Sequence, residues 1–173
     1  MNSKISALIL ILSMILTTGF SQENTSKKAK EEKKLEKQKQ IEAMVNAKEF
    51  VFVARTALPS GMRSVNLTTN TNYVKFQPDL IDSYMPYFGK AYSGIGYGGD
   101  TGLKFKDKPE VFDIVKKKKA YQIDVTVKTA NDVFRLSLSV GFEGSTSMSV
   151  ISNNRSTISY QGEISAPEKP VEK

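Results

Sequence analysis

The sequence predicts a mainly β protein: a single antiparallel β domain, barrel-like or sandwich, preceded by a signal peptide and a charged N-terminal helix. Two observations support this fold class. Apolar and polar residues alternate through most of the chain after Phe50, which is the period of strands with one buried face. No second helical pattern separates these segments, which argues against a βαβ layout. The chain has no Cys, so the domain must fold by burial alone, without disulfides.

The first residues have the three-part layout of a secretory signal peptide. A polar start with one positive charge, Met1 to Lys4, precedes an apolar run from Ile5 to Leu16 and then small and polar residues. The run of about 12 residues is shorter than the roughly 20 that a membrane-spanning helix needs. Gly19 and Ser21 fit the preference of signal peptidase, so we expect cleavage near Ser21. The expected location is periplasmic or extracellular, without stable membrane insertion after cleavage.

Residues 22–48 are predicted to form a charged helical lead-in. From Glu23 to Lys48 the chain consists mainly of Lys, Glu, Gln and Ala, with no Gly or Pro. Opposite charges recur three or four residues apart, which supports a solvated helix. The large apolar residues that could dock on a core lie mostly in its second half: Leu35, Ile41, Met44 and Val45.

The β domain is predicted to span residues 49–165. A strand begins at Phe50 and ends before a turn at Leu58–Gly61, and a second strand covers Val65 to Thr69. A third strand, Tyr73 to Gln77, is followed by Pro78–Tyr84, which we interpret as a single helical turn with Pro at its first position.

Further strands are expected in the second half of the chain, with a hairpin at Ala130–Asp132 and another tight hairpin at Asn153–Asn154. Residues 166–173, with two prolines among charges, are predicted to be a disordered tail. The expected strands are Leu103–Lys106, Val111–Lys116, Tyr121–Thr129, Val133–Val140, Ser147–Ile151 and Ser156–Ile164.

The composition argues against an enzyme. The chain has no His and no Cys, which excludes Ser–His–Asp and Cys–His nucleophiles and histidine metal sites. A strand rather than a helix follows the glycines of residues 94–99, so no nucleotide site is expected. We expect no catalytic residue, no metal and no cofactor. A carboxylate-based hydrolase stays open as a less favoured alternative, and its candidate residues are Asp79, Asp82, Asp100 and Glu143.

The formal net charge of +7 does not indicate a nucleic-acid partner, since much of the excess lies in the lead-in and in Lys116–Lys119. That lysine run is expected to be a solvated turn that keeps sheet edges from pairing. Contact of the run with anionic lipid or polysaccharide is the alternative.

Aromatic residues gather in one short Gly- and Pro-containing stretch, and they are the candidate binding residues: Tyr84, Tyr87, Phe88, Tyr92 and Tyr97. Aromatics with a polar tip favour binding surfaces because they bury area at low entropic cost. The alternative is that Tyr87 and Phe88 close one end of the sheet as core. Arg155 is expected to pair with an acid, and Tyr160 to pack inward.

Two segments, Met85–Tyr92 and Asn154–Gly162, resemble domain of unknown function family 4251, a group of uncharacterised exported proteins of the Bacteroidota. The resemblance covers about Phe50 to Ile164. It implies an exported protein without an assigned activity, and it supplies no catalytic residue.

These observations lead to an exported binding or interaction module of unknown ligand. One version is an aromatic-lined pocket for a small apolar or sugar ligand, with residues 84–97 at its entrance and a cavity of roughly 300 Å³ or more. The alternative is a structural or protein-interaction component of the cell envelope.

Overall fold

The computed structural model describes residues 19–92 and 102–167. The chain divides into two compact units, residues 1–37 and 38–173. In the first unit the structure describes the beginning of helix α2 (Gly19–Ala47), and every residue from Lys27 to Lys37 is exposed. Leu35 is 54% exposed, so residues 27–37 of the helix have no buried side. The predicted charged, solvated helix is confirmed.

The last turns of α2 belong to the second unit and pack on the sheet. Ile41 and Val45 are buried, and Met44 packs against them. The helix ends where Lys48 takes a left-handed conformation with φ of 58°. The Lys48 amide donates to the carbonyl of Val45 at 3.0 Å, which satisfies one of the last carbonyls of the helix. The expectation that only the second half of the helix docks on the core is confirmed.

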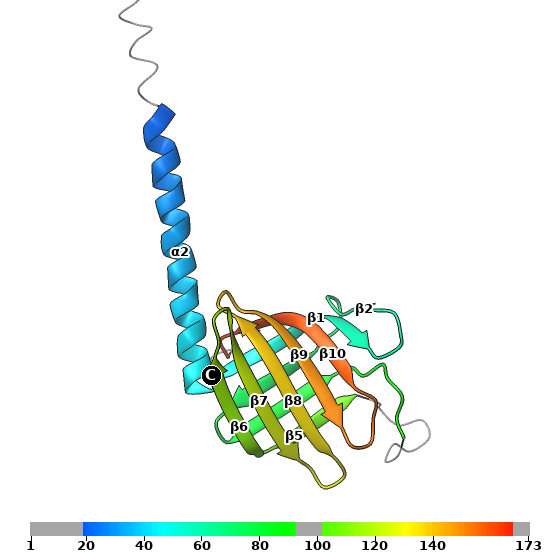
Figure 1. Cartoon of the computed structure of the whole chain (residues 1–173). Helices are drawn as coiled ribbons and strands as arrows, with labels where there is room; N and C mark the ends of the chain where they lie inside the picture. Colours follow the sequence, from blue (N-terminus) through cyan, green and yellow to red (C-terminus); the bar gives the residue numbers. More distant parts are fainter. Residues whose placement is uncertain (1–18, 93–101, 168–173) are drawn as a thin grey trace, which may run out of the picture. The chain divides into compact units, whose positions relative to one another are not determined.

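The rest of the second unit is one antiparallel sheet that curls into a nearly closed, barrel-like shape (Figure 1). The strand order is β5-β4-β3-β1-β10-β9-β8-β7-β6, and β2 pairs with β1. This confirms the predicted fold class. The strands are β1 (Phe50–Pro59), β2 (Val65–Asn66), β3 (Tyr73–Gln77), β4 (Leu80–Met85), β5 (Leu103–Asp107), β6 (Pro109–Lys116), β7 (Ala120–Lys128), β8 (Val133–Gly141), β9 (Ser145–Ser152) and β10 (Ile158–Ser165).

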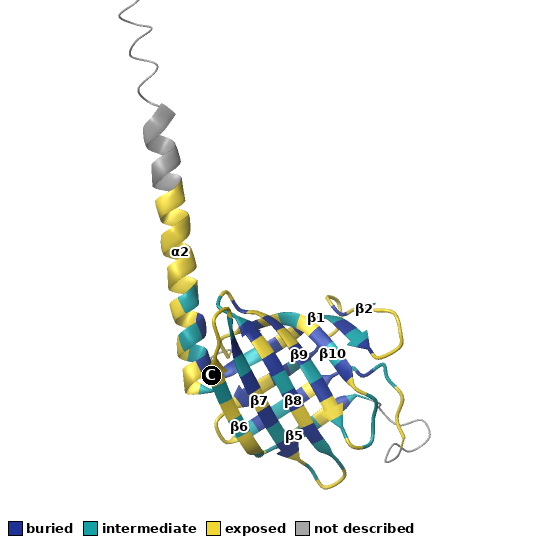
Figure 2. Ribbon diagram, in the orientation of Figure 1, coloured by how far each residue is buried: buried dark blue, intermediate teal, exposed yellow. Residues whose placement is uncertain are grey.

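Side chains of alternate residues form the core, and Figure 2 shows the resulting pattern of buried and exposed positions along β7 to β10. In β7, Tyr121, Ile123, Val125 and Val127 are all buried. Here the "outer face" of the sheet means the face opposite this core. The hairpin predicted at Ala130–Asp132 is confirmed, since β7 and β8 pair along their whole length.

Strands β5 and β6 stand at the two ends of the strand order, although only Lys108 separates them in sequence. Aromatic contacts across the interior hold these end strands in place. Phe105 of β5 stacks on Phe134 of β8 with ring centroids 4.5 Å apart, and Phe112 of β6 meets the edge of Phe76 of β3 at 6.1 Å. The packing of these aromatic side chains therefore closes the core at the end strands β5 and β6.

Two local predictions are wrong. Residues Pro78–Tyr84 do not form a helical turn, because Pro78 and Asp79 make a tight turn and β4 follows, paired with both β3 and β5. The strand predicted at Val65–Thr69 stops after Asn66. The Asn66 side-chain oxygen accepts a hydrogen bond from the backbone amide of Thr68 at 2.9 Å. Such local hydrogen bonds compete with those of a strand ladder.

The side chain of Asn72 replaces a missing strand residue beside β1. It accepts from the amide of Ala54 at 2.8 Å and donates to the carbonyl of the same residue at 3.1 Å. The position lies between the residues of β1 that pair with β3 and those that pair with β2, next to the irregularity between Ala54 and Thr56. Asn72 is 5% exposed, so this amide keeps buried backbone groups hydrogen-bonded where no strand does.

Candidate functional site

The structure separates the aromatic residues that the sequence groups together. Tyr84 lies on the outer face of β4 and is 39% exposed, whereas Tyr87 is 6% exposed and belongs to the core. Phe88 is partly buried against the core, and Tyr92 is 69% exposed. Tyr97 lies outside the described residues. The core interpretation of Tyr87 is confirmed, and the binding role of the group stays a prediction.

Tyr87 anchors the chain that follows β4. Its hydroxyl oxygen lies 2.8 Å from the carbonyl of Ser156 and 2.9 Å from the carbonyl of Lys90, and it can also accept from the Ser156 hydroxyl at 2.9 Å. A Cβ atom on Gly89 would lie 2.2 Å from the same oxygen, so only glycine fits there. Two backbone hydrogen bonds extend the connection: the Tyr92 amide donates to the Asn154 carbonyl, and the Ser156 amide donates to the Lys90 carbonyl, each at 2.8 Å.

Tyr160 joins the same region from inside. Its side chain is fully buried, which confirms the inward packing, and its hydroxyl donates to the carbonyl of Pro86 at 2.7 Å. Burial raises the pKa of Tyr160 well above the ordinary value for a phenol, and the nearby Tyr87 adds to the rise. Arg155 donates to the carbonyl of Gly102 at 3.1 Å and lies 5.2 Å from the ring of Tyr87. The two segments that carry the family resemblance, Met85–Tyr92 and Asn154–Gly162, therefore contact each other in the fold.

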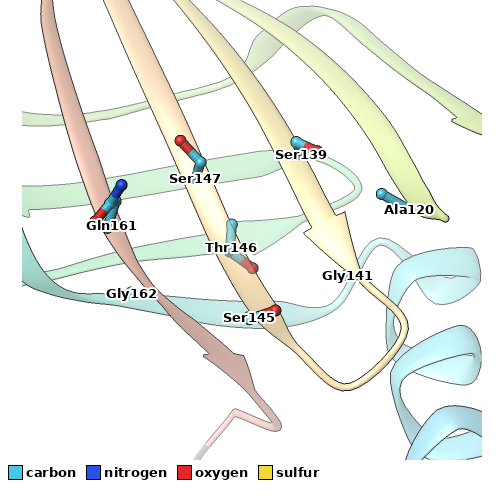
Figure 3. Close-up of a pocket in the computed structure, with 8 residues that line it drawn as sticks. All are labelled: Ala120, Ser139, Gly141, Ser145, Thr146, Ser147, Gln161 and Gly162. Carbon is cyan, nitrogen blue, oxygen red and sulfur yellow. The ribbon is translucent and has the colours of Figure 1, made fainter.

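A shallow, open depression lies on a different part of the sheet. On the outer face of β7 to β10, at the end near the turn between β8 and β9, eight residues line a depression of about 440 Å³ (Figure 3). We call it the serine depression. Its lining residues are Ala120, Ser139, Gly141, Ser145, Thr146, Ser147, Gln161 and Gly162.

Small residues make the sheet hollow at this place. Ala120 of β7 pairs with Gly141 of β8, so two adjacent positions of the outer face carry almost no side chain. Beside them, Ser147 of β9 pairs with Ser139 on one side and with Gln161 on the other. Three strands thus present two hydroxyls and an amide in one row across the floor, as Figure 3 shows.

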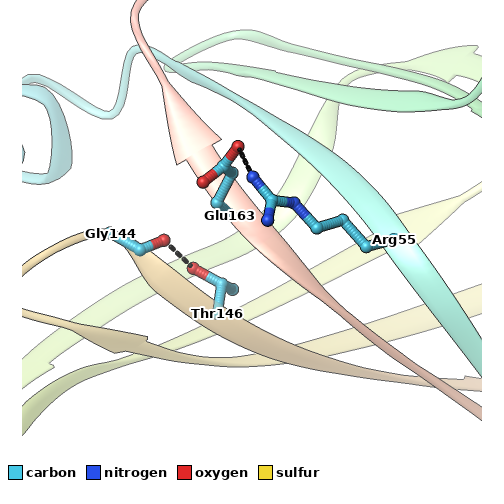
Figure 4. Close-up of polar contacts among 4 residues, drawn as sticks. All are labelled: Arg55, Gly144, Thr146 and Glu163. Atoms are coloured by element: carbon cyan, nitrogen blue, oxygen red, sulfur yellow. Dashed lines mark hydrogen bonds and ion pairs between the residues drawn. The ribbon is translucent and has the colours of Figure 1, made fainter. Parts of the chain in front are cut away.

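Close backbone packing supports the floor. A Cβ atom on Gly162 would lie 2.0 Å from the carbonyl oxygen of Val53, so a glycine is required where β10 pairs with the irregular part of β1. Thr146 points inward, and its hydroxyl donates to the carbonyl of Gly144 at 3.0 Å (Figure 4). Gly144 has a φ of 91° and packs against Ile41 of the helix.

An ion pair lies at the border of the serine depression. Arg55 of β1 donates to Glu163 of β10 at 2.7 Å (Figure 4), and Glu163 pairs in register with Ser145. Both side chains are about half exposed or more, at 63% and 49%. Because the two charges neutralise each other, the border adds little net charge to the site.

The lining chemistry is neutral and rich in hydrogen-bonding groups. A serine hydroxyl donates once and accepts twice, and the Gln161 amide supplies two donors and an acceptor. None of the eight lining residues is charged or aromatic. Sequence reasoning missed this site. The local signal that could have found it is the serine at every second position of β9, Ser145, Ser147 and Ser149, which marks one face of a strand.

The carboxylates that were kept as hydrolase candidates lie in different elements. Asp79 is exposed in the β3–β4 turn, and Asp82 of β4 pairs with Lys106 at 3.7 Å. Glu143 is exposed in the β8–β9 turn, and Asp100 lies outside the described residues. In the ranges that the structure describes, no group of three or more acidic, His or Cys side chains could hold a metal ion. Within those same ranges no helix is long and apolar enough to cross a bilayer.

Comparisons with known proteins agree with this fold. The model of the domain of unknown function DUF4251 matches residues 32–164. The chain is similar to the crystal structure, at 1.95 Å resolution, of a DUF4251 family protein from Bacteroides eggerthii DSM 20697. The TM-score is 0.58 at 15% identity, over 75% of this chain and 87% of that one, which is a likeness of fold alone. No curated protein matches the chain.

Proposed function

Since the chain belongs to the DUF4251 family, a domain of unknown function, we propose that it is a binding module whose serine depression takes a neutral, hydroxyl-rich ligand such as a saccharide. The observation that carries this proposal is the uncharged row of Ser139, Ser147 and Gln161 across three strands. Hydroxyls and amides both donate and accept, so they match a ligand whose hydroxyls do the same. A charged ligand would find no opposite charge in the lining.

The size and polarity of the depression set the expected affinity. Its volume of about 440 Å³ falls in the range of small-molecule sites. Net hydrogen bonds contribute about 1 kcal/mol each, so four ligand bonds supply about 4 kcal/mol. Because association also costs several kcal/mol of translational and rotational freedom, a Kd of about 1 mM is the tightest expected. Weak binding of this kind suits a module that meets a repeated or concentrated ligand.

The test compares two leucine variants of the same strand. Ser147→Leu fills the depression with an apolar side chain and removes one hydroxyl. Ser149→Leu makes the same change two residues along β9, on the same outer face but outside the lining. Titration with neutral oligosaccharides, followed by calorimetry, should give millimolar binding that Ser147→Leu abolishes and Ser149→Leu retains. Equal binding by both variants would contradict the proposal.

We also propose that the protein works after export, as a periplasmic or extracellular module without catalytic activity. The polar, apolar and small-residue order of the first 21 residues supports this. Intact-mass analysis of the protein from its own host should give a chain that begins at Gln22. A chain that retains Met1 would contradict export with cleavage.

A further inference from the structure

The outer face of β3, β4 and β5 carries a second ordered set of polar side chains, on strands that do not line the serine depression. The pairing register places them in two rows of three. We call this set the lysine–tyrosine face. Its members are Tyr73, Tyr84 and Lys104 in one row, and Lys75, Asp82 and Lys106 in the other.

The two tyrosines of this face order two of its lysines. The rings of Tyr73 and Tyr84 stack with centroids 5.9 Å apart and an interplanar angle of 21°. The ammonium of Lys75 lies 4.8 Å from the Tyr73 centroid, and that of Lys104 lies 4.3 Å from the Tyr84 centroid. Cation–π contacts of this length hold the long lysine chains in place. Less side-chain entropy is therefore lost when these ammoniums meet an anion.

The six residues of the lysine–tyrosine face carry a net positive charge, even though one of the three lysines pairs with the aspartate. Lys106 pairs with Asp82 at 3.7 Å, and its side chain is 65% exposed. Lys75 and Lys104 are exposed as well, and the six residues of this face include three cations and one carboxylate. Neighbouring strands lie about 4.8 Å apart, which spreads these cations over roughly 10 Å of a flat surface.

We propose that the lysine–tyrosine face binds an anionic polysaccharide. Carboxylate or sulfate groups of the polymer meet the ammoniums of Lys75, Lys104 and Lys106, while its hydroxyls meet the phenol of Tyr84, which is 39% exposed. Several weak, regularly spaced contacts suit a polymer that repeats the same charge, because each further unit binds at a raised effective concentration.

The same geometry disfavours other anionic partners. Proteins that bind single-stranded nucleic acid stack bases on open aromatic rings, whereas here each ring already contacts the other ring and a lysine. A membrane surface is held by apolar insertion together with charge, and none of the six residues of this face is aliphatic. A polysaccharide needs neither stacking nor insertion.

The test uses polygalacturonate as the probe and the full mature chain. Lys104→Gln with Lys106→Gln should weaken binding at least tenfold at low salt. Lys117→Gln with Lys118→Gln removes the same charge from the exposed β6–β7 turn and should change binding less than twofold. The single variant Lys106→Gln leaves the tyrosine stack intact and should weaken binding about threefold. Thermal melting of each variant checks that the fold is retained.

Three outcomes would overturn the proposal. If both double variants lose binding equally, the attraction is the general charge of a basic protein. If polyglutamate binds as tightly as polygalacturonate, the partner is an acidic polypeptide. If vesicles of phosphatidylglycerol bind with the same dependence on Lys104 and Lys106, the partner is a lipid surface. Binding of neutral saccharides at the serine depression is measured separately and does not depend on this result.

Discussion

The ammonium of Lys48 donates a 2.7 Å hydrogen bond to the backbone carbonyl of Phe112 and lies 4.7 Å from the centroid of the Phe112 ring. This side chain connects the end of the helix to the outermost strand of the sheet. Lys48 makes this contact from a backbone φ of 58°, where most non-glycine residues are disfavoured. The carbonyl that it satisfies lies on β6, which ends the strand order.

Replacing Lys48 by Met should lower the free energy of unfolding by about 1.5 kcal/mol, because a charged hydrogen bond to a partly buried carbonyl is lost while the aliphatic chain remains. Urea denaturation followed by circular dichroism measures the change. Lys118→Met, in the exposed β6–β7 turn, is the matched control and should stay within about 0.5 kcal/mol of the parent. Equal effects of the two changes would show that the Lys48 bond contributes nothing.

Asn72→Asp should destabilise the fold by about 3 kcal/mol. The carboxylate can still accept from the Ala54 amide, but it cannot donate to the Ala54 carbonyl, and it places an unpaired charge at a buried position. The loss should become smaller at low pH, where the carboxyl is protonated and neutral. Denaturation at pH 7 and pH 4, against Asn70→Asp in the exposed turn nearby, measures both effects. A loss that does not depend on pH would argue against a buried charge.

Gly162→Ala should cost about 2–4 kcal/mol, because the new methyl group would meet the Val53 carbonyl at 2.0 Å and backbone must move. Gly61→Ala gives the comparison. Gly61 has a φ of 72° and nothing within 4 Å of the added Cβ, so only the left-handed conformation is penalised, by about 1–2 kcal/mol. Midpoints of urea unfolding should rank the parent first, Gly61→Ala second and Gly162→Ala last. The reverse order of the two variants would mean that the backbone of β1 can shift at little cost to make room for the added methyl group.

Tyr160 should make the fold sensitive to alkali. Because burial raises its pKa in the folded state, the folded protein keeps a proton that the unfolded chain releases above about pH 10, the ordinary value for tyrosine. The stabilisation is therefore present below pH 10 and is lost as the pH rises further, by up to about 1.4 kcal/mol per pH unit. Tyr160→Phe removes this term, so its stability should fall less steeply between pH 10 and 11. If the stabilities of the two proteins fall in parallel as the pH rises, the predicted contribution of Tyr160 to alkali sensitivity is contradicted.

The sequence was sufficient for those parts of the fold that depend on local pattern. Strict alternation over Tyr121–Val127 and Phe134–Val140 predicts two strands with a shared buried face, and three turn-forming residues between them predict the hairpin. The helix lead-in follows from composition alone.

Strand β4 was not predicted, although it follows its partner β3 after a two-residue turn, because its own residues give a mixed local pattern. Its inward residues include the polar Ser83, which interrupts the apolar alternation. Ser83 is accommodated because its hydroxyl donates to the carbonyl of Leu103 at 2.8 Å, on the neighbouring β5. Pro78 suits the first position of a helix and a turn equally well, so the local signal favoured the wrong element.

The serine depression depends on register, which local pattern does not supply. Ser139, Ser147 and Gln161 come from three strands and share a row only because of the pairings β8–β9 and β9–β10. Alternating serines indicate a polar face, but the hollow arises from Ala120 beside Gly141. Aromatic content, by contrast, pointed to residues 84–97, where the described side chains serve the core, the tyrosine stack or the surface.

The most direct test of the proposed function is a two-dimensional amide NMR titration of the mature protein with a mixture of neutral oligosaccharides at millimolar concentration. We predict shifts that cluster on the lining residues of β8, β9 and β10, from Ser139 to Gly141, Ser145 to Ser147 and Gln161 to Gly162. Shifts confined to residues 84–92 would instead favour the aromatic segment that the sequence indicated. The absence of shifts throughout the sheet at millimolar ligand would contradict a binding site for neutral saccharides at the serine depression.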